Sequence, residues 1–196
     1  MQRVYLDNAA TTAIRPEVVD EMANVMKNVF GNPSSTHVFG REAKALIEMA
    51  RKNIAQRLNI SPAEIYFTSC GTESNNTIIR SCVNDLDVTR IITSDMEHKC
   101  VQESIKDLEY RGKVEVIRIN IQKNGDIDYA QLEELVKDQS KKTLVSLMHA
   151  NNEIGNLTDI KRISQLCQEN NTLFHTDTVQ TAVSYTHLRA HETKAN

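Results

Sequence analysis

The segment from Phe174 to Thr181 places one carboxylate and one amide just beyond a short apolar run. It reads F-H-T-D-T-V-Q-T, with Asp177 and Gln180 three residues apart. The run predicts a buried strand whose carboxyl end lies at the sheet edge where open α/β folds bind ligands. An acidic group at this edge is able to hold a cationic ring nitrogen. Capping of a helix by Asp177 is the ordinary alternative.

A second polar cluster, Thr68 to Ser74, reads T-S-C-G-T-E-S between a predicted strand and a predicted helix. A glycine turn, small hydroxyl residues and a helix N-terminus together supply the free N–H groups and the dipole that bind a phosphate. An ordinary N-capped turn, with Ser69 or Thr72 as the cap, explains the pattern equally well. The G-K-[ST] ending of a P-loop is absent, which disfavours a nucleoside triphosphatase.

The third cluster, Ser94 to Cys100, reads S-D-M-E-H-K-C and contains His98. A flat imidazole that titrates near neutrality is suited to stack on a planar ligand or to transfer a proton. A histidine at a helix start with a satisfied hydrogen bond is the simpler interpretation of this residue alone. Cys100 has no matching ligand pair elsewhere in the sequence, so we expect no metal site.

The fourth cluster, Met148 to Gly155, reads M-H-A-N-N-E-I-G and brings two asparagines and a glutamate to a predicted strand end. An Asx-turn closed by Gly155 accounts for this pattern without any ligand. The argument for a site is convergence, because four segments at strand ends present polar groups toward one edge of a parallel sheet.

The elements that must position these clusters alternate between β-rich runs and amphipathic helical patterns, which is typical of βαβ units. The predicted strands are Ile65–Thr68, Arg90–Thr93, Val114–Asn120, Thr143–Met148 and Leu173–Thr176. The predicted crossover helices are Gln102–Arg111, Tyr129–Lys137 and Asp159–Asn170. Right-handed crossovers give a doubly wound α/β fold with a mainly parallel sheet. Two helices precede the sheet, Glu17–Phe30 and Val38–Leu58, with the turn-rich F-G-N-P-S-S-T-H between them.

The composition narrows the class of protein. Of the 196 residues, 40% are hydrophobic and 25% are charged. No apolar run approaches the roughly 20 residues of a membrane span. The net charge of -3 gives no electrostatic basis for binding nucleic acid or an anionic membrane. Four cysteines without C-x-x-C spacing indicate reduced thiols, and the N-terminus lacks a secretion signal, so we expect a cytoplasmic protein.

Six motifs in order give the sequence a close resemblance to the cysteine desulfurases, which are fold type I pyridoxal 5′-phosphate (PLP) enzymes of the class V aminotransferase superfamily. The motifs are Y-L-D-N-A-A-T-T (Tyr5–Thr12), F-G-N-P-S-S-T-H (Phe30–His37), F-T-S-C-G-T-E-S-N-N (Phe67–Asn76), E-H-K (Glu97–Lys99), H-A-N-N-E-I-G (His149–Gly155) and H-T-D-T-V-Q (His175–Gln180). The resemblance implies an N-terminal segment at residues 1–14, a partial PLP-binding large domain at 15–182 and a tail unrelated to the family at 183–196.

The resemblance implies a phosphate site and a stacking residue. Gly71 and Thr72 would bind the cofactor phosphate through N–H and hydroxyl groups at a helix N-terminus. His98 would stack on the pyridine ring and would be the catalytic residue that assists proton transfer.

The resemblance also implies three contacts to the edge of the cofactor ring. Asn152 and Gln180 would hydrogen-bond near the phenolic oxygen. Asp177 would pair with the pyridinium nitrogen, which keeps the ring protonated and able to accept electrons.

Members of the resembled family act on L-cysteine. A loop cysteine takes the substrate sulfur, alanine is released, and the persulfide serves a sulfur-acceptor protein, either a scaffold for iron–sulfur cluster assembly or a tRNA-thiolation protein. The resemblance further implies a homodimer with no direct contact to nucleic acid or membrane. The alternatives are a fragment of a selenocysteine lyase or of another class V aminotransferase, and, in a different class, a non-catalytic fragment.

The sequence departs from the family after Gln180. The family continues toward a lysine that bonds the cofactor, in an S-x-H-K type motif, whereas residues 183–196 here read V-S-Y-T-H-L-R-A-H-E-T-K-A-N. Lys194 lacks the histidine that precedes the family's lysine, and none of the four cysteines lies in a persulfide motif. We therefore expect a truncated chain that is inactive by itself.

Overall fold

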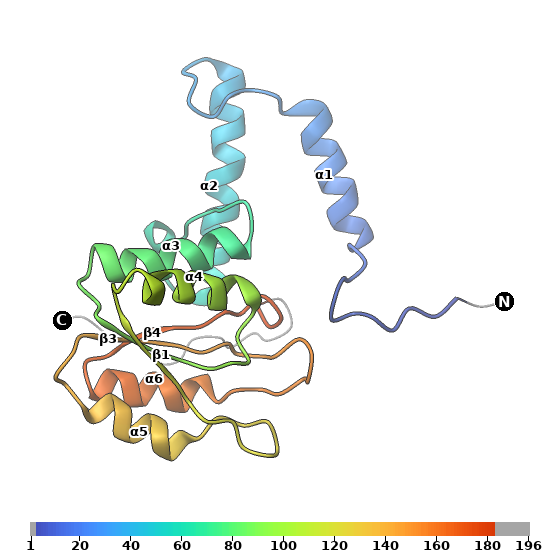
Figure 1. Ribbon diagram of the computed structural model, residues 1–196. Helices are drawn as coiled ribbons and strands as arrows, with labels where there is room; N and C mark the ends of the chain where they lie inside the picture. The colour runs from blue at the N-terminus through green and yellow to red at the C-terminus, as the bar shows by residue number, and fades with distance from the viewer. Residues whose placement is uncertain (1–2, 183–196) are drawn as a thin grey trace. The chain divides into compact units, whose positions relative to one another are not determined.

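The computed structural model describes residues 3–182, and the chain divides into one unit that ends at Phe67 and another that begins at Thr68. The first unit holds two helices and a short 3-10 helix, and the second holds the sheet with its covering helices (Figure 1). Among the described residues, no helix is both long and apolar enough to cross a membrane.

The first unit contains the two helices predicted to precede the sheet. α1 (Pro16–Asn28) begins with a proline, whose fixed φ suits a first helical turn, and α2 spans Val38–Leu58. The turn between them is tight, because a β-carbon on Gly40 would lie 2.4 Å from the carbonyl oxygen of Ser35. Phe30 and Phe39 stack across this turn with ring centroids 5.3 Å apart.

The helix α1 exposes its apolar side chains. Its apolar residues recur at helical spacing, yet no residue of α1 is buried in the described part of the chain. Met26 is 78% exposed, and Val18, Val19 and Met22 are about half exposed. The described residues therefore leave an apolar face of α1 exposed.

The prediction of a strand at Ile65–Thr68 is wrong. A 3-10 helix, η1 (Pro62–Glu64), ends directly before this segment, and the segment pairs with no strand among residues 3–182. The carbonyl of Ile65 instead accepts a hydrogen bond from Arg51, whose guanidinium lies 4.9 Å above the Phe67 ring. β propensity reflects fit to a neighbouring strand, and this segment has none here.

The second unit contains a four-stranded sheet whose strands are parallel, as predicted. Its strands are β1 (Arg90–Thr93), β2 (Glu115–Arg118), β3 (Thr143–Ser146) and β4 (Leu173–His175), in the order β2-β1-β3-β4. Ile91 of β1 is in register with Val116 on one side and Leu144 on the other. β1 has the predicted bounds, whereas β2, β3 and β4 are shorter than predicted, because residues that follow them belong to the loops at the carboxyl edge.

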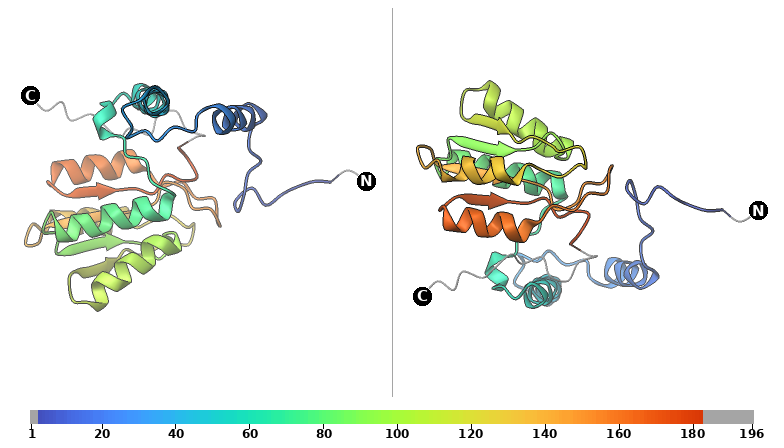
Figure 2. Two further views of the ribbon diagram at one scale, coloured as in Figure 1. Left: turned by 90° about the horizontal axis from the view of Figure 1, so that it is seen from above. Right: turned by 90° about the horizontal axis from the view of Figure 1, so that it is seen from below.

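Helices cover both faces of the sheet, which makes the fold doubly wound (Figures 1 and 2). α3 (Gly71–Asn84) and α4 (Lys99–Tyr110) lie over one face, and α5 (Tyr129–Lys137) and α6 (Ile160–Glu169) lie over the other. Asp128 and Asp159 cap the N-termini of α5 and α6 by accepting backbone N–H groups.

Adjacent residues of the central strands separate the core into two layers. Ile91 and Leu144 pack beneath α3 and α4, while their neighbours Ile92 and Val145 pack against α5 and α6. All four side chains are almost completely buried. This period of two in strands buried on both faces is what a parallel sheet requires.

The carboxyl ends of β1 and β3 form the topological switch point of the sheet. The chain leaves β1 toward α4 on one face and leaves β3 toward α6 on the other. Neighbouring loops that diverge in this way leave a crevice between them, which is where open α/β sheets bind ligands.

Candidate functional site

Asp177 lies two residues beyond β4 and is held from three directions. Its Oδ2 accepts a hydrogen bond from Asn75 Nδ2 at 2.8 Å, and its Oδ1 accepts from the Val179 N–H at 2.9 Å. Its backbone oxygen accepts from the His149 N–H at 3.0 Å, which ties the loop to the end of β3. The carboxylate is only 8% exposed. Asp177 thus closes a local turn, and each carboxylate oxygen keeps one lone pair for a ligand.

A buried chain of polar groups lies behind Asp177. The Oδ1 atom of Asn75 is 3.2 Å from His175 Nε2, and His175 Nδ1 is 2.9 Å from Ser146 Oγ. Burial lowers the pKa of His175, although the charge of Asp177 opposes this shift. The imidazole is therefore neutral at neutral pH. Sequence reasoning did not single out Asn75, yet it lies on the same face of α3 as the buried Ile79, and an amide on an apolar helix face is a detectable signal.

Gly71 is the first residue of α3 and lies against the Asp177 loop. A β-carbon placed on Gly71 would be 2.9 Å from Cγ2 of Val179. Glycine therefore permits the start of the helix to approach the loop that carries Asp177 and Gln180. The structure brings together two of the predicted clusters in this way, the phosphate turn and the strand end with its carboxylate.

The start of α3 stabilises negative charge. The side chain of Cys70 makes no capping hydrogen bond, but the backbone N–H of Glu73 and then the Ser69 hydroxyl lower the pKa of its thiol. The Glu73 carboxylate accepts from Ser69 Oγ at 2.6 Å and from the Ser69 N–H at 2.7 Å, which lowers its own pKa. Thr72 is exposed beside these groups. An anionic phosphate fits the chemistry of this turn.

His98 is the N-cap residue of α4, as expected for a histidine at a helix start with a satisfied hydrogen bond. Its Nδ1 accepts from the Cys100 N–H at 3.3 Å and lies 2.9 Å from Cys100 Sγ. With Nδ1 engaged as an acceptor, the neutral ring carries its proton on Nε2. The ring itself is exposed, so one face remains accessible to a planar ligand.

Two hydrogen bonds connect the loops on either side of the crevice between the ends of β1 and β3. The Met148 N–H donates to Glu97 Oε1 at 2.8 Å, and Asn151 Nδ2 donates to the Met96 carbonyl at 2.9 Å. Asn151 Oδ1 also accepts from the N–H groups of Glu153 and Ile154. These hydrogen bonds form the Asx-turn that was the alternative interpretation of this segment. The loop that carries His98 is thereby fixed to the loop that carries Asn152.

Glu97 is an acid in an unusual state. It is 4% exposed, and burial raises its pKa to about 8 in spite of hydrogen bonds from Met148 and Ser94, with the charge of Asp177 adding to the shift. Its Oε2 has no hydrogen-bond partner among the described residues. At neutral pH the side chain is a protonated carboxylic acid. Sequence reasoning quoted this residue only as part of a motif.

A cleft of about 540 Å³ opens beside these loops and is lined by His98 and Asn152 among others. Gly71, Thr72 and Asp177 are not part of its lining, and Gln180 is exposed on its own loop. Asn152 makes no side-chain hydrogen bond to another described residue, so its amide is available to a ligand. The cleft therefore contains two of the six predicted residues, His98 and Asn152. Of the other four, Gly71 contacts the loop that carries Asp177 and Gln180, and Asn75 hydrogen-bonds Asp177 from the helix that begins with Gly71 and Thr72.

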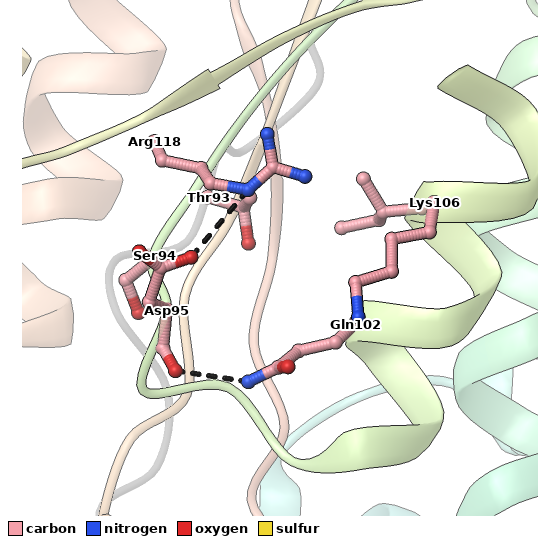
Figure 3. A pocket seen from close by; sticks show the side chains of 7 residues that line it. Thr93, Ser94, Asp95, Gln102, Lys106 and Arg118 are labelled. Atoms are coloured by element: carbon pink, nitrogen blue, oxygen red, sulfur yellow. Dashed lines mark hydrogen bonds and ion pairs between the residues drawn. The ribbon is translucent and has the colours of Figure 1, made fainter. Parts of the chain in front are cut away.

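A second, smaller pocket adjoins this cleft between the end of β1, α4 and β2 (Figure 3). Arg118 reaches over it and pairs with Asp95 at 3.4 Å, while Gln102 donates to the Asp95 carbonyl at 2.9 Å. Its volume of about 20 Å³ has room for one water molecule. Because its arginine is already paired, we assign no ligand to this pocket.

The fold and this edge of polar groups define a class of protein, the doubly wound α/β proteins, in which a parallel sheet presents its ligand residues at the switch point. The profile of the aminotransferase class-V family matches residues 4–189, and the chain belongs to that family.

The curated relatives that the chain matches include cysteine desulfurases. The chain is 43% identical over 182 residues to the cysteine desulfurase IscS of Dictyoglomus turgidum, covering 92% of this chain and 45% of the relative. It is 42% identical over 180 residues to the cysteine desulfurase IscS of Neisseria meningitidis serogroup A, covering 90% of this chain and 44% of the relative. The chain thus spans just under half the length of the curated relatives it matches.

Solved structures agree with this comparison. A NifS-like protein superposes with a TM-score of 0.86 at 39% identity, covering 92% of this chain and 50% of that protein. SspA in complex with cysteine superposes with a TM-score of 0.83 at 34% identity, covering 90% of this chain and 51% of SspA.

Proposed function

We propose that this chain supplies the cofactor-binding part of a PLP-dependent cysteine desulfurase. The observation that carries the proposal is the Asp177 carboxylate at the end of β4, beside the glycine start of α3 and with one lone pair open on each oxygen. The cysteine desulfurases among the relatives, and the cysteine bound by SspA, favour L-cysteine over selenocysteine as the substrate of the whole protein.

The residues of this chain would hold PLP from its phosphate to its ring nitrogen. The N–H groups of Gly71 and Thr72 at the start of α3 bind the phosphate, where the lowered pKa values of Cys70 and Glu73 support a preference for negative charge. Bound PLP supplies an electron sink for the substrate carbanion. Asp177 keeps a proton on the ring nitrogen by accepting its hydrogen bond.

The remaining predicted residues act on the face and the phenolic edge of the ring. His98, with Nδ1 held by the Cys100 N–H, presents its ring face for stacking and its Nε2 as the atom that can hold or give up a proton. Asn152 and Gln180 donate amide hydrogen bonds at the phenolic oxygen. The hydrogen bonds between the β1 and β3 loops keep His98 and Asn152 at a constant separation.

The whole protein would release alanine and pass sulfur to an acceptor protein for iron–sulfur clusters or tRNA thiolation. We further propose that it is a homodimer, which the exposed apolar face of α1 supports. The cytoplasm is the proposed compartment, because all four cysteines are unpaired thiols.

The test of cofactor binding uses pyridoxine 5′-phosphate, which keeps the ring nitrogen, phenolic oxygen and phosphate but has no aldehyde to react with lysines. Equilibrium dialysis should show binding to the chain and weakening by at least about tenfold in Asp177→Asn, because a charged hydrogen bond is lost. Asp85→Asn is the matched control, since Asp85 is an exposed carboxylate at the far end of α3. Equal affinities of Asp177→Asn and the parent chain would reject the proposal.

The desulfurase reaction itself is tested by alanine release. We expect no alanine from L-cysteine and PLP with this chain alone, because no lysine or cysteine in it matches the family's reactive positions. Alanine release at an enzymatic rate would show that the chain is active without those motifs.

A further inference from the structure

Asn75 joins Asp177 to a neutral histidine, and only one arrangement of protons satisfies every member of the group. The amide is buried at 6% exposure. Its two ends differ, because the nitrogen can only donate and the oxygen can only accept. Nδ2 lies 2.8 Å from Asp177 Oδ2, so the nitrogen donates to the carboxylate. The opposite orientation would place two acceptors, Oδ1 and the carboxylate oxygen, against each other.

The orientation of Asn75 determines the protonation of His175. Since Asn75 Oδ1 accepts, His175 Nε2 at 3.2 Å must carry the hydrogen. Nδ1 then has a free lone pair and accepts from the Ser146 hydroxyl at 2.9 Å. Ser146 is fully buried in β3, so the chain of hydrogen bonds runs from the middle of the sheet to the carboxylate.

Asn75, Ser146 and Asp177 are buried and His175 is partly buried, so most of the group lies away from solvent. Its members come from α3, β3, β4 and the loop after β4, and the amide of Asn75 also lies 3.4 Å from Cys100 Sγ on α4. Every hydrogen-bonding atom of the Asn75 amide, the His175 ring and the Ser146 hydroxyl has a partner. A buried network with all members satisfied is rigid, and breaking it leaves unpaired polar groups.

We propose that Asn75, His175 and Ser146 are positioning residues that fix the rotation of the Asp177 carboxylate so that its open lone pairs face the ligand. Asn75 acts directly on Oδ2, His175 Nε2 holds the Asn75 amide in the orientation that donates to Oδ2, and Ser146 supports the His175 ring at Nδ1. This inference rests on the proposed function, since it takes Asp177 as the partner of the ring nitrogen.

The first test needs no ligand. Long-range proton–nitrogen NMR of the full chain, with His175 assigned by comparison with His175→Gln, should show the Nε2–H tautomer. Asn75→Leu removes the acceptor that holds this tautomer, so the Nδ1–H form should appear, now donating to Ser146. A charged or Nδ1–H imidazole in the unmodified chain would overturn the inference, as would an unchanged tautomer in Asn75→Leu. If Asn75→Leu does not fold, Asn75→Ala removes the same acceptor with less bulk.

The second test asks whether Asn75 acts through Asp177. Asn75→Ala should weaken pyridoxine 5′-phosphate binding about tenfold in the normal background, as expected for loss of a hydrogen bond to a charged group. In the Asp177→Asn background the same change should have little further effect, because the carboxylate it orients is gone. Asn76→Ala, on the adjacent position of α3, controls for loss of helix stability.

The two proposals fail differently. Equal losses for Asn75→Ala in both backgrounds would show a merely structural role and overturn the inference while leaving the proposed function intact. Loss of affinity in Asp177→Asn but none in Asn75→Ala would likewise overturn the inference and leave the proposed function intact. No binding by the unmodified chain would reject the proposed function itself, whatever the tautomer of His175.

Discussion

Glu97 shows how a single buried group sets the behaviour of the site at the scale of one residue. It lies in the crevice at the switch point, accepts the N–H of Met148 and is neutral at neutral pH because burial disfavours its charge. A neutral acid bridges the β1 and β3 loops without adding a second negative charge near Asp177. Ionisation of Glu97 would therefore lower the stability of the folded state.

The first prediction concerns this ionisation. The folded pKa of about 8 exceeds the ordinary value of 4.5, so between these pH values the folded chain holds a proton that the unfolded chain has lost. The free energy of unfolding should fall as pH rises through this window, by at most about 1.4 kcal/mol per pH unit, and level off above it. Glu97→Gln should remove that slope in urea unfolding at pH 5, 7 and 9.

A matched control for Glu97 is Glu103→Gln, which changes an exposed carboxylate on α4. The control should keep the slope of the unmodified chain. Parallel pH profiles for Glu97→Gln and the unmodified chain would contradict the assignment of a neutral acid.

The sequence was informative about residues that contact a ligand and less so about those behind them. Asp177 and Gly71 stood out through their places at a strand end and a helix start, within motifs that occur in the order typical of the family. Asn75, Glu97 and His175 owe their importance to partners about 50 to 100 residues away in the sequence, which residue type alone does not reveal.

At the scale of elements, the contact between α3 and the loop after β4 determines whether the phosphate turn and Asp177 can serve one ligand. Gly71 and Val179 form this contact, and a β-carbon on Gly71 would lie 2.9 Å from Cγ2 of the exposed Val179 side chain, which would have to turn aside. The helices and the four strands of the sheet followed from the periodicity of apolar residues. The strand at Ile65–Thr68 did not form, since a strand depends on a pairing partner that a local pattern cannot supply.

The second prediction tests this contact. Gly71→Ala should force the exposed side chain of Val179 aside and lower stability by no more than about 1 kcal/mol, because this contact lies outside the core. It should also weaken pyridoxine 5′-phosphate binding. Val179→Ala removes the Cγ2 atom that the new methyl group would meet, so the double variant should regain most of both losses. Additive losses in thermal unfolding and dialysis would show that the close approach is unimportant.

At the scale of the whole molecule, the apolar face of α1 is the feature that the described chain leaves uncovered. The chain spans under half the length of its curated relatives, and the apolar side chains Met22 and Met26 on this face are exposed. Composition alone could not reveal this, because the overall fraction of apolar residues is ordinary. The tail expected to be unrelated to the family, residues 183–196, lies outside the described residues.

The third prediction is that the chain self-associates through α1. Met22→Glu combined with Met26→Glu should lower the mass measured by light scattering, because two charges would then interrupt the apolar face. Lys27→Glu changes the net charge by the same two units beside that face and should leave the mass unchanged. A compact monomer of the unmodified chain, or equal effects of both variants, would contradict the prediction.

The central claim is that Asp177 holds a protonated ring nitrogen at the carboxyl edge of the sheet. The most direct measurement is the nitrogen-15 signal of ring-labelled pyridoxine 5′-phosphate bound to the chain, at a pH where the free ligand's ring nitrogen has lost its proton. A protonated ring nitrogen on the unmodified chain, and an unprotonated one on Asp177→Asn, is the predicted result. An unprotonated nitrogen on both proteins would contradict the account.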